Sequence, residues 1–300
     1  MRKIVITCES GINPYDMSYM IPDNIISITK DKNYHDTINI SKDNIGVITG
    51  EEVLDRVNDG EVFKTSSPTV SDLQDMFYKY VKDGYDVIHI SMSSGISEGF
   101  LNASHAASLN DDFIDHVTVI DSLTGGSGGI VLYKYAWDLV NKGLSYNEIV
   151  DEIYRVLERV KAAFYISSTK GFVGSGRAPR ILKCMDALKL RYRVDINEKD
   201  TGMVEKGKLY PSKIYRGDIN KTAFKYVNEL INENNIEEYD PNYLGILKSK
   251  LEKIELERIL EYIKSYKYFK EDNIMLGGFY AVISSYSVND QLGIGLIRKK

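Results

Sequence analysis

The chain has 300 residues, which suits one large domain or two ordinary ones, and 43% of them are hydrophobic. This content supplies a folded core, so a disordered chain is excluded. The formal net charge is −5, from 38 Lys and Arg against 43 Asp and Glu, and both signs are mixed along the sequence. Because phosphate backbones are bound by concentrated basic surfaces, nucleic acid is not expected as a partner.

Neither a disulfide framework nor a metal site is expected. The two cysteines, Cys8 and Cys184, lie far apart, and the four histidines form no close helical pair with a carboxylate. The first ten residues reach Glu9 before any cleavage-like segment, and no run of about 18 apolar residues occurs. We therefore expect a cytoplasmic protein without a membrane span, for which only a transient membrane contact stays open.

Short β-rich runs alternate with helical stretches, which is typical of α/β folds. The predicted strands are residues 3–7, 25–29, 86–91, 117–121, 163–167 and 279–285. The predicted helices are residues 71–82, 129–141, 145–161, 220–234 and 248–268, and a hairpin is expected over 199–215. We predict a two-domain α/β fold: an N-terminal, parallel-sheet, Rossmann-like domain of residues 1–160 and a second α/β domain of residues 161–300.

Small hydroxyl residues cluster where predicted strands end and helices begin. The three clusters are Thr65–Thr69, Ser91–Ser97 and Ser122–Gly129. In an open parallel sheet such loops lie at one edge, beside helix N-termini that carry unpaired N–H groups. The sequence therefore predicts a site for a small anionic group, with ordinary helix capping as the alternative for any one loop.

Catalytic motifs in the sequence are incomplete. Gly125–Gly129 matches the G-x-S-x-G pattern of serine hydrolases around Ser127, but the last histidine of the chain, His116, precedes it. An esterase-like hydrolase using Ser127 stays as an unfavoured alternative. Gly202–Leu209 nearly matches a P-loop, but Leu209 stands where the magnesium-binding hydroxyl belongs. We therefore expect no catalytic residue and no cofactor.

Three short motifs carry a resemblance to a known family. They are Thr65-Ser66-Ser67-Pro68, the segment from Ser93 to Ala103, and Val119-Ile120-Asp121-Ser122. These are similar to the TSQPS, SSGLSGTYQSA and VIDS elements of the DegV family of bacterial fatty-acid-binding proteins. Weaker similarity near residues 21–36, 174–177, 207–217 and 292–294 extends the resemblance over nearly the whole chain.

The resemblance implies a carrier that encloses one long-chain fatty acid between two domains. It also implies that a separate ATP-dependent fatty acid kinase phosphorylates the bound acid, so that the carrier itself is not an enzyme. By this resemblance Thr65 and Ser97 contact the carboxylate, and we place their neighbours Ser66 and Ser94 with them.

Two departures from the family pattern fall near the expected head group. Glu98 takes the place of a glycine, and Tyr286 opens a segment where the family has His-Thr-Gly-Pro-Gly. We expect both side chains to lie at the carboxylate, with Asp290 adding negative potential nearby. The departures keep open a binding protein for a different anionic, amphipathic ligand on the same fold.

Two arginines are candidates for contact with the kinase or its phosphate. Arg177 and Arg216 match positions where the family has basic residues near the mouth of the second domain. Guanidinium groups suit phosphate and carboxylate recognition. Ordinary surface ion pairs are the alternative for both.

Overall fold

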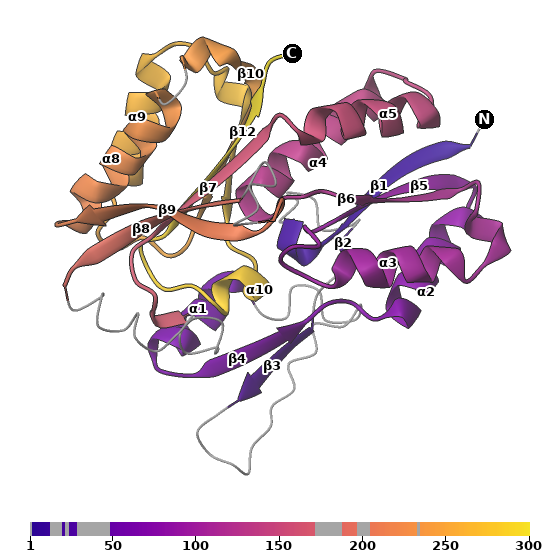
Figure 1. Cartoon of the computed structure of the whole chain (residues 1–300), viewed down its shortest axis with the longest axis horizontal. Coiled ribbons are helices and arrows are strands. Elements are labelled where there is room, and N and C mark those ends of the chain that lie inside the picture. The colour runs from indigo at the N-terminus through magenta and orange to yellow at the C-terminus, as the bar shows by residue number, and fades with distance from the viewer. Residues whose placement is uncertain are drawn as a thin grey trace.

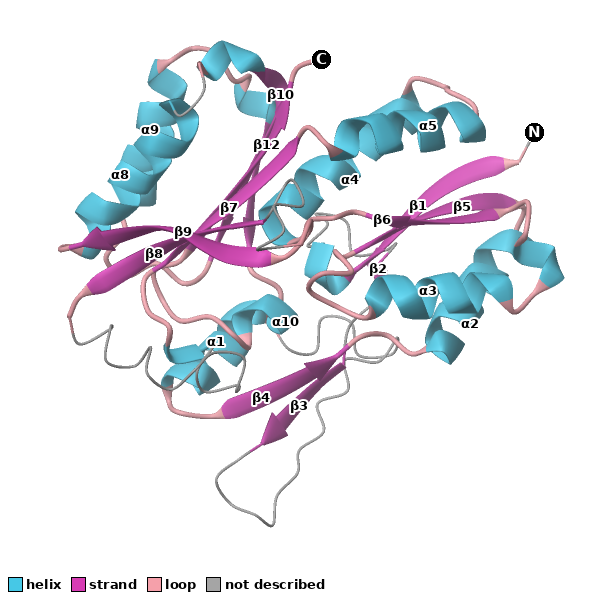
Figure 2. Ribbon diagram, in the orientation of Figure 1, coloured by secondary structure: helices cyan, strands magenta, loops and turns pink. Residues whose placement is uncertain are grey.

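The structure is a computed structural model that describes residues 2–12, 20–21, 24–28, 49–171, 188–196, 205–232 and 235–300. Two β-sheets dominate it, and helices cover their outer faces (Figure 1 and Figure 2). A single helix, α4 (Gly126–Asn141), contacts both sheets and lies between them. The layers are therefore helix, sheet, helix, sheet and helix.

The first sheet is wholly parallel and has the order β2-β1-β5-β6. Its strands are β1 (Lys3–Glu9), β2 (Met20–Ile21), β5 (Tyr85–Ser91) and β6 (Val117–Asp121). Because side chains of a strand alternate between faces, Val5 packs toward α2 (Val70–Lys82) and α3 (Gly99–Ser108), while Ile6 packs toward α4 and α5 (Tyr146–Leu157). This arrangement confirms the predicted parallel-sheet, α/β class.

The second sheet is mixed and has the order β11-β10-β12-β7-β8-β9, in which only β10 and β11 pair in parallel. Its strands are β7 (Val160–Ile166), β8 (Leu190–Ile196), β9 (Leu209–Arg216), β10 (Tyr239–Lys248), β11 (Ile274–Gly278) and β12 (Leu292–Arg298). Helices α8 (Ile219–Asn232) and α9 (Leu256–Ser265) cover one face, and α4 packs against the other. The domain boundary at residue 160 stays a prediction.

A small unit outside these layers connects an early segment of the chain with a late one. The ribbon of β3 (Asn24–Ile28) and β4 (Val62–Ser66) is antiparallel, and α1 (Gly50–Asn58) precedes β4. Val53, Val57 and Phe63 from this part pack against Ala281 and Val282 of the short helix α10 (Ala281–Ser284). Residues near position 60 are therefore held against residues near position 282. Four 3₁₀ turns complete the described chain, at Ser10–Ile12, Asp111–Phe113, Ile236–Glu238 and Glu271–Asn273.

Most of the predicted elements are present, and four are corrected. The helix predicted over 145–161 ends at Leu157, because β7 begins at Val160. Residues 279–285 form a helix and not a strand, since α10 occupies 281–284. The helix predicted over 248–268 is shorter, because β10 runs to Lys248 and α9 begins at Leu256. The hairpin is built from β8 and β9, so its first strand lies before the predicted start, and residues 197–204 fall outside the described chain.

The first turn of α4 packs unusually closely on the second sheet. A Cβ atom at Gly295 of β12 would overlap the backbone carbonyl oxygen of Ser127, so only glycine allows this approach. Ser127 itself is fully buried there. Cβ atoms at Gly128 and Gly129 would likewise come too close to Ala162 and to the backbone of Ile12, so the glycines of the G-x-S-x-G match serve close packing.

We expect Gly295→Ala to lower the free energy of unfolding by about 1 to 3 kcal/mol, because the added methyl group meets backbone atoms that cannot rotate away. Gly278→Ala on β11 is the matched control, since its Cβ would meet no atom within 4 Å. Chemical denaturation of both variants measures the difference. Equal stability of the two variants would contradict the close packing described here.

Candidate functional site

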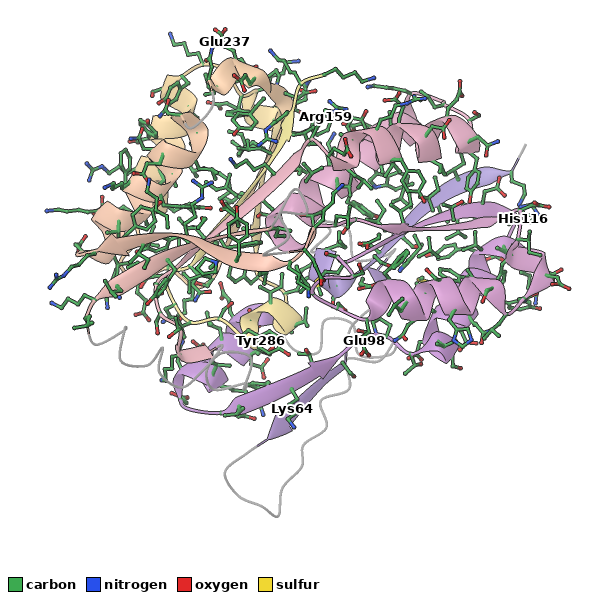
Figure 3. The ribbon with its side chains drawn as sticks, in the orientation of Figure 1. Lys64, Glu98, His116, Arg159, Glu237 and Tyr286 are labelled. Carbon is green, nitrogen blue, oxygen red and sulfur yellow. The ribbon has the colours of Figure 1, made fainter. Side chains whose placement is uncertain are left out.

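A cavity of about 440 Å³ lies between the two sheets and opens beside β4 and α10. Both parts of the chain line it. Figure 3 labels Glu98 at the start of α3 and Tyr286 near α10, with β4 below them. The lining is polar on one side, where it consists of Thr65, Ser66, Ser67, Ser97 and Glu98.

The opposite wall of the cavity is mainly apolar, although Tyr286, Ser287 and Gln291 also belong to the lining. Its apolar side chains come from β7, β8, β9 and the segment around α10: Phe164, Ile166, Val194, Leu209, Phe279, Val282 and Ile283. Sequence analysis missed these residues, because apolar residues of a core and of a cavity carry the same signal. The cavity is therefore amphipathic, and among the described residues that line it none is basic.

Thr65 and Tyr286 meet directly at the polar side. The Thr65 hydroxyl, at the end of β4, forms a hydrogen bond with the phenol of Tyr286, which is buried just after α10. Two residues that were expected at one head group are thus brought together across 221 positions of sequence. Ser66 follows Thr65, is exposed, and lines the same side.

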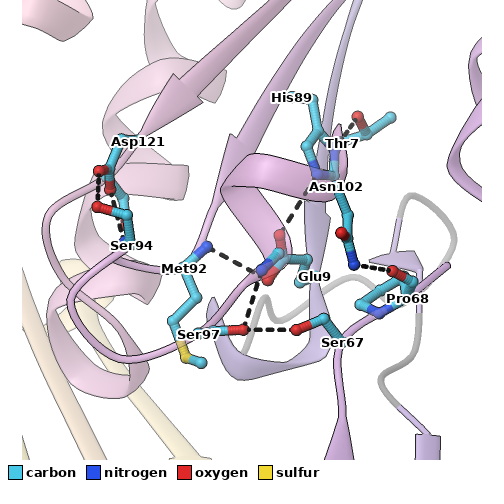
Figure 4. A network of polar contacts seen from close by, with 12 residues as sticks. Thr7, Glu9, Ser67, Pro68, His89, Met92, Ser94, Ser97, Asn102 and Asp121 are labelled. Atoms are coloured by element: carbon cyan, nitrogen blue, oxygen red, sulfur yellow. Dashed lines mark hydrogen bonds and ion pairs between the residues drawn. The ribbon is translucent and has the colours of Figure 1, made fainter. Parts of the chain in front are cut away.

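Ser97 connects a second hydroxyl to the start of α3 (Figure 4). Its Oγ lies 2.9 Å from the Ser67 Oγ and accepts a hydrogen bond from the backbone N–H of Gly99 at 3.2 Å. Helix α3 has Glu98 as its N-cap residue, and the Glu98 side chain makes no capping bond. The Ser97 hydroxyl therefore does the capping, and the exposed Glu98 carboxylate remains at the cavity.

Ser94 does not line the cavity, contrary to our expectation. Its hydroxyl and its N–H donate to the carboxylate of Asp121 at 2.5 and 3.1 Å, and the N–H of Leu123 also donates to Asp121. Asp121, at the end of β6, thus ties the loop after β5 to the loop after β6. Ser94 positions the hydroxyl loop instead of presenting a ligand contact.

The three hydroxyl clusters do meet, although not all on one sheet. The loops after β5 and β6 leave the first sheet at its carboxyl edge, as predicted. Thr65 belongs instead to the β3–β4 ribbon, outside that sheet. The contact between Ser67 and Ser97 brings the ribbon to the same edge.

Asp290 lies away from the cavity lining, so its predicted effect on the head group is not supported. Its carboxylate accepts hydrogen bonds from the backbone N–H groups of Glu252, Lys253 and Ile254, at 2.7 to 3.1 Å. The side chain is buried and organises the turn before α9. Its negative charge is thereby stabilised by backbone donors of the second domain.

The structure describes one of the two candidate arginines. Arg216 ends β9 at the opposite end from the cavity-lining Leu209, about 23 Å along an eight-residue strand. Arg216 does not line the cavity, and its contact with a kinase stays a prediction. Arg177 lies outside the described residues.

The structure gives no support to a hydrolase at Ser127. The Ser127 side chain is fully buried and does not line the cavity, and its Oγ has no hydrogen-bond partner among the described residues. A nucleophilic serine requires an adjacent base and access to the substrate. Among the residues that the structure describes, no group of three or more His, Cys, Asp and Glu side chains could hold a metal ion.

Comparison with known proteins identifies the family of the chain. The family model described as "Uncharacterised protein, DegV family" matches residues 24–299. The chain belongs to the DegV family. A DegV domain-containing protein of Clostridium acetobutylicum is 30% identical over 221 residues, which cover 71% of this chain and 74% of the relative. The resemblance drawn from the three short motifs is thus confirmed.

Two further relatives carry names that mention fatty acids. A fatty acid-binding protein of Thermotoga maritima is 29% identical over 190 residues, which cover 62% of each chain. The crystal structure of the Streptococcus pneumoniae fatty acid kinase B3 protein, loaded with linoleic acid, covers 99% of this chain and all of its own, with a TM-score of 0.76 and 18% identity. The fold of this chain is therefore similar to that of this linoleic acid-loaded protein.

A buried acid and base next to the site escaped sequence analysis. Glu9 and His89 lie 80 positions apart and belong to no motif in the sequence. Their side chains lie close together behind the polar side of the cavity (Figure 4). The available signal was alternation, because Thr7 and Glu9 occupy the same face of the buried strand β1.

Proposed function

We propose that this DegV protein binds one long-chain fatty acid in the amphipathic cavity and presents its carboxylate to a separate ATP-dependent kinase. The observation that carries the proposal is a cavity with hydroxyl groups on one side and seven apolar side chains on the other, in a chain of this family. Its volume of about 440 Å³ falls within the range of small-molecule sites. We place this activity in the cytoplasm, as expected for an ATP-dependent reaction.

The two walls of the cavity contribute differently to binding. Burial of a tail of about 15 methylenes corresponds to on the order of 12 kcal/mol of gross transfer free energy, whereas each hydrogen bond to a charged group contributes about 1.5 to 3 kcal/mol. The tail therefore supplies most of the affinity. The hydroxyls of Thr65 and Ser97 fix which end of the acid lies at the mouth.

Among the helices that the structure describes, none combines the length and the apolar character that crossing a bilayer requires.

The same cavity would also accept another anionic amphipathic molecule. Glu98, which stands at the polar side where the family has a glycine, motivates this second candidate, because a changed lining favours a changed head group. Lipid extraction and mass spectrometry of natively purified protein distinguish the two.

We expect protein purified under native conditions to carry one long-chain fatty acid per chain, detected by native mass spectrometry. Val194→Trp should abolish this adduct, because the indole fills the space beside the apolar wall. Ile214→Trp is the matched control on the neighbouring strand, where Ile214 is 56% exposed and does not line the cavity. Clean apo protein that also fails to take up a fluorescent fatty acid would refute the proposed ligand.

Thr65→Ala and Ser97→Ala should each weaken fatty-acid binding by about 1 to 3 kcal/mol, because each removes one hydrogen bond to a charged group and leaves tail burial intact. Ser108→Ala, at the other end of α3, is the control. Binding is measured by isothermal titration calorimetry and stability by thermal unfolding. Wild-type affinity together with a lower melting temperature would show that these hydroxyls only cap and connect backbone.

Arg177→Glu should impair acyl phosphate formation by a fatty acid kinase while fatty-acid binding is retained, because the substitution reverses a charge that the family places near the mouth. Arg216→Glu should impair turnover less, since Arg216 lies at the far end of β9. Trapping the acyl phosphate with hydroxylamine measures the product. Unchanged turnover of the Arg177 variant would remove this residue from the kinase contact.

A further inference from the structure

A buried pair of titratable side chains lies behind the polar side of the cavity. Glu9 at the end of β1 and His89 in β5 are both 0% exposed, and Glu9 Oε1 lies 3.8 Å from His89 Nε2. His89 Nδ1 shares a hydrogen bond of 3.0 Å with the Thr7 hydroxyl (Figure 4). The imidazole is thereby held with its other nitrogen toward the carboxylate.

The pair is closely connected to residues that line the cavity. Glu9 Oε2 accepts a hydrogen bond from the backbone N–H of Met92 at 3.4 Å, and Met92 lines the cavity. A Cβ atom at position 99 would overlap both carboxylate oxygens of Glu9, so Gly99 makes room for this side chain at the first turn of α3. Ser97 accepts a hydrogen bond from the N–H of Gly99, so Gly99 connects Ser97 with the buried carboxylate.

Neither side chain is fully satisfied by its neighbours. Glu9 Oε1 and His89 Nε2 have no hydrogen-bond partner among the described residues. A buried charge without a partner is costly, so each of the two groups depends on the other for compensation. The carboxylate and the imidazole therefore act electrostatically as one unit.

Among the described residues, His89 is the one basic group that forms an ion pair with Glu9. Helix α2 presents the ring of Phe77, whose centroid lies 5.5 Å from that of His89. Helix α3 presents Gly99 and, at the cavity, the carboxylate of Glu98, while β6 ends in Asp121, which is bound by Ser94 and Leu123. Of the described groups packed against Glu9, His89 is the basic one.

We propose that the Glu9–His89 pair sets the charge behind the head-group site and couples binding of a carboxylate to the protonation of His89. The inference rests on the proposed function, and it assigns to this pair a positioning role, without contact to the ligand. With His89 protonated and Glu9 ionised the pair is neutral, and with His89 neutral it carries a charge of −1. An anion binds the neutral pair more tightly, so binding takes up a proton and weakens as the pH rises.

Because no described residue of the cavity lining is basic, the charge of the Glu9–His89 pair behind it matters for binding of an anion. The described lining offers hydroxyls and backbone N–H groups but no cation to a carboxylate. Gain or loss of one proton changes the charge of the pair between 0 and −1, so the repulsion that it exerts on a bound anion changes with it. A coupling between two such sites typically changes an affinity by about 5- to 150-fold, and we expect about fivefold because the pair lies one layer behind the wall.

The experiment measures the dissociation constant of palmitate between about pH 5 and pH 8 for the wild type, Glu9→Gln, His89→Gln and His116→Gln. His116 is the matched control, because it forms the other histidine–carboxylate pair of this sheet, with Asp86 at 2.8 Å. Wild type and His116→Gln should bind about fivefold more weakly at the high pH. Glu9→Gln should bind tightly at both pH values, and His89→Gln weakly at both.

Opposite effects of the two variants separate an electrostatic role from a structural one, which would weaken both. Titration calorimetry of the wild type in buffers with different ionisation enthalpies gives a readout without any substitution, and net proton uptake on binding is expected. Palmitate binding that is independent of pH, or without proton uptake, overturns the inference and leaves the proposed function intact. A wild type that binds no palmitate at any pH overturns both.

Discussion

The contact on which the rest of the structure depends is the packing of the first turn of α4 against β12. Gly295 lets the carbonyl of Ser127 approach the sheet at a distance that no side chain would allow. The helix can then bury its other face on the first sheet, so both sheets share one apolar core. The residues before that turn, Gly125 and Gly126, consequently end in the cavity wall.

The polar side of the cavity is organised before any ligand arrives. Thr65 is bonded to Tyr286, and Ser67 to Ser97, so the hydroxyls that face the cavity already satisfy one another. A hydroxyl can rotate its proton toward a new acceptor at little cost, because it carries both a donor and lone pairs. Asp121 fixes the loop that carries Ser97 through backbone and side-chain donors of its neighbours. Rigid loops with rotatable protons suit a carboxylate that enters and leaves.

Sequence reasoning succeeded where the signal was local. The helix that begins after Ser145, the strand ending at Asp121 and the hydroxyl loops all follow from short-range chemistry. It failed where contacts with residues far along the chain determine the local structure. Residues 279–285 have the composition of a strand, but they form a helix because Ala281 and Val282 pack on Val53 and Phe63. Ser94 resembled a ligand group because its bond to Asp121, 27 positions away, cannot be read from the letters.

The bond between Thr65 and Tyr286 also constrains how the chain acquires its site. These residues lie 221 positions apart, and the helix between the sheets joins segments that are almost as distant. Closing such long loops is slow compared with forming local helices, so we expect the cavity to form after the local helices during folding. A ligand that binds only the finished cavity stabilises the complete fold and none of its precursors. Occupancy by the ligand would therefore mark chains whose synthesis and folding have both reached the C-terminal segment.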